Sequence, residues 1–335
     1  MYLLKKYLTV REGEGHIIIA GGDQTVYVPL TKQNYELLEK ISSKGIDLSL
    51  YESSDIVQKL IASNCLIEQR LVKSNYSRKE LFFSYLGVDL DKERVENYKI
   101  LVLGAGGGGS TLVYAYAQFG FKYLWSLDFD IVEKSELEKT MIYRKGDIGK
   151  KKVRALKETI QDSFDTTIKV YDEKVQNYAR LTEIIKEIQP DFIVNAIDPD
   201  PRHKLMLNDI CIQTKTPVLF IAYSYESLIL GPLIEPGQTS CYRSYYNYIK
   251  EGTQGVVDFE TIKRVTTINS IQPSVSFNTN ILASLALKET LFFMHGKTDY
   301  VSTYNSLIFY NVLTMEGESY ELSCSSCQCK KVRSE

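Results

Sequence analysis

Apolar and polar positions alternate along the middle of the chain with the spacing of a strand, a helix and a second strand. The apolar run Ile100 to Leu103 is short enough for a buried strand, a helical apolar pattern follows through Phe119, and a second apolar run covers Tyr123 to Leu127. Similar patterns predict helices at 149–161, 180–188 and 202–214 and strands at 168–171, 191–196 and 217–222. Because strands that alternate with helices form a parallel sheet covered on both faces, we predict a doubly wound, Rossmann-like α/β domain.

Less regular patterns flank this domain. We expect a strand at 226–234, a helix at 276–295 and closing strands at 304–310 and 312–315, whereas 242–273 shows no strong period. Residues 1–72 predict a small winged-helix-like α+β module, with strands around a Gly-Gly-Asp turn, helices that begin after Thr31 and Ser54, and a closing strand at 65–68. Its exposed strand edge could accept a peptide; the alternative is a stabilising or dimer-forming cap. The polar segment 73–98 is typical of a linker.

The first predicted strand is followed by a glycine-rich turn. Gly104, Gly106 and Gly109 satisfy the spacing G-x-G-x-x-G, Gly107 lies between them, and Asp128 follows about 20 residues further on. A turn without Cβ atoms lets backbone N–H groups approach phosphate, and the helix N-terminus adds partial positive charge. Asp128 would then hold ribose hydroxyls. This combination favours a nucleotide site over a merely structural turn.

Composition narrows the function classes. At 335 residues the chain exceeds one average domain, so two are expected. A formal net charge of −2 gives no broad attraction to nucleic acid or to membrane surfaces, and no apolar stretch is long enough to span a bilayer. We find no N-terminal signal pattern, and six Cys without a paired framework favour a cytoplasmic location. None of the three His sits near a Ser or Cys as in a catalytic triad.

Four ordered segments carry a resemblance to a known family. They read DFDIVEKSEL at 128–137, GDIGKKKV at 146–153, NAIDP at 195–199 and GPLIEPGQTSCY at 231–242. From about Tyr76 to about Cys327 the chain resembles the ThiF/MoeB group of ATP-dependent adenylating enzymes, which are related to ubiquitin-activating enzymes. The layout is most similar to the microcin C peptide adenylyltransferase branch. This resemblance implies a ThiF/MoeB-like adenylation domain at 99–330, a crossover segment at 242–273, an N-terminal peptide clamp like a RiPP recognition element, and a homodimer.

The resemblance also implies an ATP site with Mg²⁺. It assigns Asp198 to the magnesium ion, Lys152 to the phosphates with help from Lys150, and Arg78, in a Tyr-Ser-Arg segment, to the triphosphate across the dimer interface. Lys139 stands where the family usually has Arg, and it keeps the charge but loses the bidentate fork. The expected nucleotide-binding set is the glycine turn with Asp128, Asp130, Ser135, Lys150 and Lys152.

Two features depart from the family pattern. Glu136 stands where the family usually has Asn, which brings a negative charge towards the triphosphate. Family members with a structural zinc have two Cys-x-x-Cys pairs, and here the resemblance offers Cys241, Cys324, Cys327 and Cys329 as zinc ligands, with plain thiols as the alternative. No Cys lies between Tyr242 and Tyr320, which argues against a thioester on the crossover segment.

The predicted function is therefore ATP-dependent adenylation of a carboxylate on a ribosomally synthesised precursor peptide, with release of pyrophosphate, during maturation of a peptide antibiotic or related product. The acyl-adenylate would then be trapped or cyclised. One alternative is a non-catalytic homologue that docks the peptide for a partner enzyme, for which Glu136 and Lys139 argue. A sulfur-carrier-protein adenylyltransferase is another. An NAD enzyme rests on the glycine motif alone.

Overall fold

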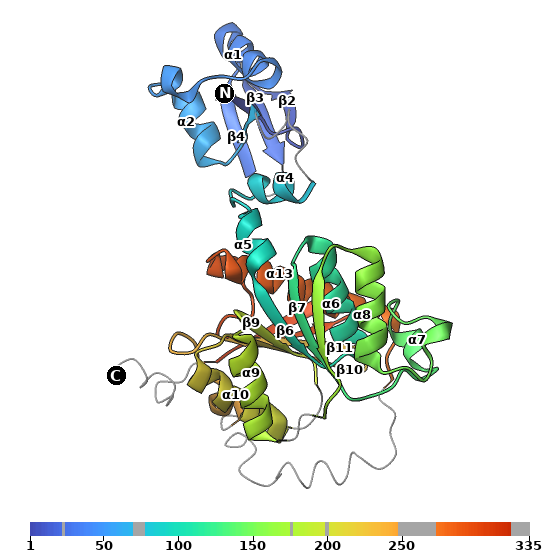
Figure 1. Ribbon diagram of the computed structural model, residues 1–335. Coiled ribbons are helices and arrows are strands. Elements are labelled where there is room, and N and C mark those ends of the chain that lie inside the picture. Colours follow the sequence, from blue (N-terminus) through green and yellow to red (C-terminus); the bar gives the residue numbers. More distant parts are fainter. Residues whose placement is uncertain (22–23, 70–77, 175–176, 198–200, 247–272, 323–335) are drawn as a thin grey trace. The chain divides into compact units, whose positions relative to one another are not determined.

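The computed structural model describes residues 1–21, 24–69, 78–174, 177–197, 201–246 and 273–322 (Figure 1). The chain divides into two compact units, Met1–Asp91 and Lys92–Glu335. The boundary falls inside the segment 73–98, where helices α4 (Arg78–Tyr85) and α5 (Lys92–Asn97) lie on its two sides.

The N-terminal unit combines two small antiparallel sheets with short helices. One sheet has the order β2 (Thr9–Gly13), β3 (His16–Gly21), β4 (Gln24–Pro29), and the other pairs β1 (Tyr2–Leu4) with β5 (Leu66–Glu68). Helices α1 (Lys32–Ser43) and α2 (Asp55–Ala62) lie between β4 and β5 in the chain, with a short η1 (Leu48–Tyr51) between them. Thr31 and Ser54 cap the two helices as the sequence predicts, because each hydroxyl accepts a backbone N–H three residues on. The core gathers alternate apolar residues of β3 and β4 against both helices.

Helix α4 is fastened to this unit by buried polar contacts. The Tyr85 carbonyl accepts hydrogen bonds from Lys5 Nζ at 2.6 Å and from Asn64 Nδ2 at 2.9 Å, and the Tyr85 ring lies 5.1 Å from the Tyr7 ring. Lys5 is 1% exposed, and this burial lowers the pKa of its ammonium group. Arg78, the first residue of α4, therefore belongs to the N-terminal unit.

The C-terminal unit is built on an eight-stranded sheet of order β13-β12-β11-β10-β9-β6-β7-β8. Five neighbouring strands are parallel: β6 (Lys99–Leu103), β7 (Tyr123–Leu127), β8 (Thr167–Tyr171), β9 (Phe192–Asn195) and β10 (Val218–Ser224). The strands β11 (Ser227–Ile234), β12 (Ser306–Asn311) and β13 (Glu316–Glu321) extend the sheet in antiparallel fashion. The prediction of a Rossmann-like α/β fold is confirmed.

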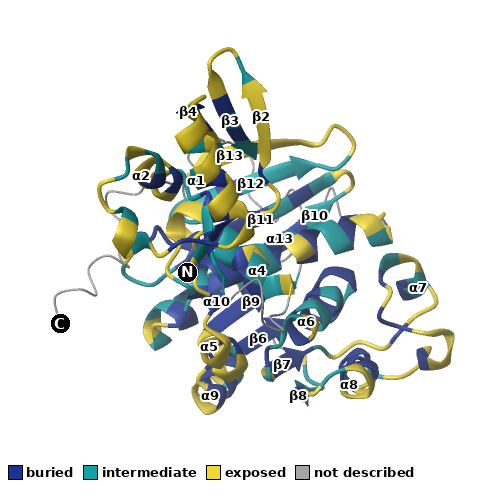
Figure 2. Ribbon diagram, turned by 90° about the horizontal axis from the view of Figure 1, so that it is seen from above, coloured by how far each residue is buried: buried dark blue, intermediate teal, exposed yellow. Residues whose placement is uncertain are grey.

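Helices cover both faces of this sheet. Helices α6 (Gly107–Phe119), α8 (Lys152–Ser163) and α13 (Ser276–Met294) lie on one face, and α9 (Tyr178–Ile188) and α10 (Pro201–Thr214) lie on the other (Figure 1). The described residues of this unit also include the short helical turns α7 (Glu136–Lys139), η2 (Lys145–Asp147) and η3 (Thr298–Tyr300). The central strands β6 and β9 are almost wholly buried (Figure 2). Strand order reverses between β6 and β9, and at such a switch point doubly wound sheets form a ligand crevice beyond the carboxyl ends of the strands.

One predicted strand is wrong. Residues 312–315 form the turn between β12 and β13, and the last strand begins at Glu316. The cause is local, because Asn311 Oδ1 accepts the backbone N–H groups of Leu313 and Thr314, and Met315 adopts φ = 62°. Within the described residues, helices long and apolar enough to cross a membrane are absent.

Candidate nucleotide site

A cavity of about 520 Å³ lies beyond the carboxyl ends of β6, β7 and β9. Its wall comes from the glycine turn after β6, from Asp128 to Asp130 after β7, from α7 and the first residue of α8, and from Ala196 and Ile197 after β9. The crevice predicted from strand order and the cavity of the folded unit therefore coincide.

The glycines of the turn have two different roles. Gly104 has φ = +94°, and a Cβ on it would lie 2.9 Å from the Ala196 carbonyl oxygen; a Cβ on Gly109 would lie 2.0 Å from the Gly104 oxygen, and one on Gly107 2.6 Å from a Thr279 methyl group. These three glycines are required by the fold itself. Gly106, the N-cap of α6, differs, since a Cβ there would meet nothing within 4 Å. Its bare backbone leaves open space in the cavity at the positive end of a helix.

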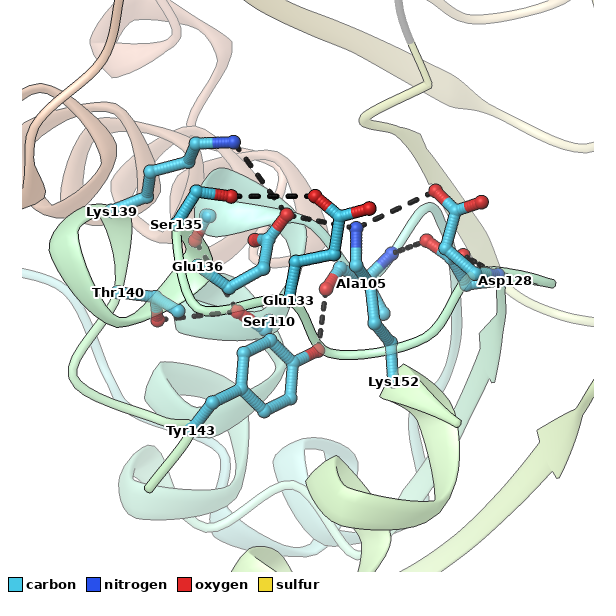
Figure 3. Close-up of polar contacts among 12 residues, drawn as sticks. Ala105, Ser110, Asp128, Glu133, Ser135, Glu136, Lys139, Thr140, Tyr143 and Lys152 are labelled. Atoms are coloured by element: carbon cyan, nitrogen blue, oxygen red, sulfur yellow. Dashed lines mark hydrogen bonds and ion pairs between the residues drawn. The ribbon is translucent and has the colours of Figure 1, made fainter. Parts of the chain in front are cut away.

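Asp128 braces the glycine turn (Figure 3). Its Oδ2 accepts the backbone N–H of Ala105 at 2.7 Å and its Oδ1 accepts that of Asp130 at 2.8 Å. On the other side of the turn, the Tyr143 hydroxyl donates to the Ala105 carbonyl at 2.5 Å. Burial, reinforced by the nearby carboxylates of Asp128 and Glu136, raises the pKa of Tyr143 well above its ordinary value, so this hydroxyl stays protonated and keeps donating.

Two lysines and a carboxylate meet at the cavity wall. Glu136 Oε1 lies 3.1 Å from Lys152 Nζ and 3.6 Å from Lys139 Nζ, and Lys152 Nζ also lies 3.5 Å from Asp130 Oδ2. Burial disfavours the charge on Lys152, but the carboxylates of Glu136, Asp128 and Asp130 outweigh it and raise the lysine pKa. Lys152 is thus an ammonium group at neutral pH, although its side chain is only 9% exposed.

Contacts distant in sequence fix the short helix α7 that carries Glu136 and Lys139. The Lys139 carbonyl accepts the hydroxyl of Thr279 on α13 at 2.5 Å. Thr140, just after α7, lies within hydrogen-bond distance of the hydroxyls of Ser110 and Thr111 on α6, at 3.3 and 3.2 Å. Since both α6 and α13 are long, packed helices, α7 holds the side chains of Glu136 and Lys139 in defined places.

The β9 side of the cavity carries His203, which sequence reasoning missed. Asn195 Nδ2 donates to the Ile197 carbonyl at 3.0 Å, so the Asn195 oxygen faces His203 Nε2, also at 3.0 Å. His203 Nε2 therefore donates to this oxygen. The sequence signal that could have found His203 is its place in the first turn of α10, the helix that follows β9. Glu173 and Lys174 also line the cavity and were not predicted; Glu173 pairs with Arg180, and Lys174 lies over the Phe129 ring.

The cavity brings together eight of the predicted site residues: Gly104, Gly106, Gly107, Gly109, Asp128, Asp130, Lys139 and Lys152. Two others do not line it. Ser135 Oγ lies 3.5 Å from Glu133 Oε2, and Lys150 pairs with Asp147 and Glu158 at 3.0 and 2.7 Å. Arg78 belongs to the other unit.

The predicted metal ligands are for the most part not placed. Asp198, Cys324, Cys327 and Cys329 lie outside the described residues, as does most of the predicted crossover segment. Cys241 is buried, with Sγ 3.5 Å from Ser244 Oγ. In the described part of the chain, groups of three or more His, Cys, Asp or Glu that could hold a metal ion are absent.

A glycine turn followed by an acid at the switch point of a doubly wound sheet is the arrangement typical of nucleotide-binding α/β proteins, and here a buried and a half-buried lysine stand beside it. Within that class the chain belongs to the ThiF family, whose family model matches residues 76–331.

Curated relatives cover part of the chain. A SUMO-activating enzyme subunit 2 of Dictyostelium discoideum is 28% identical over 155 residues, which is 45% of this chain and 22% of that protein. A probable molybdopterin-synthase adenylyltransferase of Pyropia yezoensis is 30% identical over 158 residues, 47% of this chain and 40% of that protein. The chain thus matches less than half the length of either relative.

A solved structure covers nearly the whole fold. E. coli MccB with ATP superimposes with a TM-score of 0.82 at 18% identity, over 98% of this chain and 99% of that one. A structure of the microcin C7 biosynthetic enzyme MccB in complex with N-formylated MccA is also similar, with a TM-score of 0.77 at 18% identity over 98% of this chain and 99% of that one.

Proposed function

We propose that this protein is an ATP-dependent adenylyltransferase that activates a carboxylate of a ribosomally made peptide. The observation that carries the proposal is a cavity in which the open backbone at Gly106 faces the same space as Asp128, Lys139 and Lys152. Membership of the ThiF family and the fold shared with MccB, which has been solved with ATP and with MccA, support it.

Adenylation joins a carboxylate oxygen to the α-phosphorus of ATP and expels pyrophosphate. The carboxylate is already a competent nucleophile, so positioning and charge stabilisation do most of the work. In this chain Lys139 and Lys152 would bind phosphate oxygens, and the phosphates would approach the N–H groups at Gly106. Asp128 would hold the ribose with the lone pairs that the turn does not use.

The site's carboxylates suit a hard cation such as Mg²⁺, which typically takes one or two protein carboxylates together with phosphate oxygens. Asp198 stays the predicted ligand, with Asp130 beside the lysines in the cavity wall. When bound, the ion would neutralise phosphate charge and stabilise the leaving pyrophosphate.

The peptide would be held by the N-terminal unit, whose β2 is an exposed edge strand of its sheet. Homodimerisation, the role of Arg78, the structural zinc site and the trapping or cyclisation of the acyl-adenylate remain predictions of the family resemblance. Light scattering tests the dimer, and zinc analysis of the purified full chain tests the metal.

Two measurements test the enzymatic proposal. Calorimetry with Mg²⁺ and α,β-methylene ATP should show nucleotide binding to the full chain. Exchange of labelled pyrophosphate into ATP should then depend on a synthetic peptide encoded by a short reading frame beside the gene. Nucleotide binding without exchange for any such peptide would contradict the substrate class.

The ion pairs of Glu136 favour a second candidate, a non-catalytic homologue that docks a peptide for a partner enzyme. Here the two lysines expected to bind phosphate are already paired with a protein carboxylate. This candidate predicts no nucleotide binding at millimolar ATP with Mg²⁺, so the same calorimetry separates the two functions.

A further inference from the structure

Glu136 is the least expected group in the cavity wall. Its side chain is 7% exposed, and its Oε1 contacts the ammonium groups of both Lys152 and Lys139. Its other oxygen, Oε2, is buried and accepts no hydrogen bond from the described residues. A buried carboxylate with one unpaired oxygen is poorly solvated, so its stability here depends on the two lysines.

The same lysines are the groups that a phosphate chain would bind. A bound phosphate and Glu136 therefore compete for the two ammonium groups, and they repel each other at close range. The backbone that carries Glu136 is held in place, because α7 is fixed to α6 through Thr140 and to α13 through the Lys139 carbonyl. The Glu136 carboxylate therefore stays close to the two lysines.

The cavity lining as a whole carries no net positive charge. Glu173 is neutralised by its pair with Arg180, and three carboxylates and three ammonium groups then remain in the described lining, a formal charge of zero: Asp128, Asp130, Glu136, Lys139, Lys152 and Lys174. A free nucleoside triphosphate carries about four negative charges and its magnesium complex about two, so the free form has the larger unmatched charge in this cavity.

We propose, on the basis of the function proposed above, that Glu136 is the residue that restricts this site to nucleotides already complexed with a divalent cation. The carboxylate leaves Lys139 and Lys152 too little net positive charge to hold a bare triphosphate. The metal complex is accepted because the bound ion supplies the positive charge that Glu136 neutralises on the two lysines.

The test compares nucleotide affinity with and without metal. The probe is α,β-methylene ATP, titrated calorimetrically into the full chain with excess Mg²⁺ or with EDTA. The wild type should bind the magnesium complex at least 100-fold more tightly than the free nucleotide. In Glu136→Gln, which keeps the shape and removes the charge, this ratio should fall at least tenfold, mainly through tighter binding of the free form.

Matched variants separate charge from packing. Glu136→Asp keeps the carboxylate and should retain most of the wild-type ratio. Glu138→Gln removes an equal charge from an exposed position of the same helix outside the cavity lining, and the ratio should stay at the wild-type value. If Glu136→Gln does not fold, Glu136→Asn provides a shorter neutral side chain with the same expected fall.

The outcomes are distinct. A wild-type chain that binds the magnesium complex, together with an unchanged ratio in the folded neutral variant, overturns the role of Glu136 and leaves the proposed function standing. A neutral variant that binds the magnesium complex at least tenfold more weakly than the wild type also overturns it, since Glu136 would then act as an attractive ligand. A wild-type chain that binds neither form overturns the proposed function itself.

Discussion

Gly106→Ala separates ligand binding from folding more cleanly than other changes in the glycine turn. An added Cβ at this residue would meet nothing within 4 Å, and its φ of −70° is one that alanine adopts readily. Alanine is a poorer N-cap than glycine by about 1 kcal/mol. The lower entropy of the unfolded chain returns about 0.4–1 kcal/mol, so the free energy of unfolding should hardly change.

Nucleotide binding should respond very differently. The methyl group would occupy the open space where a phosphate has to approach the backbone, and one charge-assisted hydrogen bond is worth about 1.5–3 kcal/mol. We therefore expect the dissociation constant for magnesium α,β-methylene ATP to rise roughly 10- to 150-fold. Calorimetry measures this change, and urea unfolding measures the stability.

Two glycine variants serve as comparisons. Gly146→Ala adds a methyl group at another open position outside the cavity lining, so it should leave the nucleotide affinity unchanged and raise the free energy of unfolding by about 0.4–1 kcal/mol. Gly109→Ala would place a Cβ 2.0 Å from the Gly104 oxygen, so it should cost about 3 kcal/mol or more of stability. Wild-type affinity in Gly106→Ala would refute the idea that phosphate lies against this turn, and a wild-type free energy of unfolding in Gly109→Ala would refute the account of its geometry.

Three further predictions concern buried polar groups. Lys152→Gln should destabilise the fold by about 1–3 kcal/mol in urea unfolding, since it leaves the Glu136 carboxylate with Lys139 alone, and Glu136→Gln added to it should restore most of the loss; additive losses would contradict the pairing. Tyr143→Phe should cost about 1 kcal/mol at pH 8. Because the pKa of Tyr143 is raised in the folded state, the unfolded chain loses this proton first, and the wild type should lose stability relative to Tyr143→Phe as pH rises above 10. A difference in the free energy of unfolding that stays constant with pH would contradict the buried hydroxyl. Glu289 is a buried residue of α13 whose carboxylate accepts hydrogen bonds from the Thr303 N–H and hydroxyl. Glu289→Gln should lower the free energy of unfolding by about 2 kcal/mol, while nucleotide affinity should stay at the wild-type level.

Local sequence patterns predicted the centre of the fold. The strand, turn, helix and strand around the glycines, and the caps at Thr31 and Ser54, follow from periodicity and from the preferences of short polar side chains, and the structure confirms them. The missed strand β2 has a mixed polar sequence, and the missed strand β1 is only three residues long, so both are defined mainly by their partners. The failed strand at 312–315 shows how the side chain of Asn311 can end a strand that an apolar pattern suggests.

The sequence predicted which residues belong to the site much better than it predicted which of them contact one another. The sequence identifies Lys139 and Lys152 as candidates and marks Glu136 as unusual. It does not show that all three meet, because α7 is placed by a contact from Lys139 to Thr279, 140 residues away in the sequence. His203 was missed for the same reason, since its position depends on Asn195 at the end of a different element.

The anchoring of α4 places two predicted roles, peptide binding and the phosphate contact of Arg78, in the same unit. Lys5 and Asn64 both donate to the Tyr85 carbonyl, so the helix that begins at Arg78 is part of the N-terminal unit. If that unit holds the peptide, and if Arg78 contacts the triphosphate as the family resemblance implies, both roles would depend on the same two hydrogen-bond donors, the ammonium group of Lys5 and the amide of Asn64.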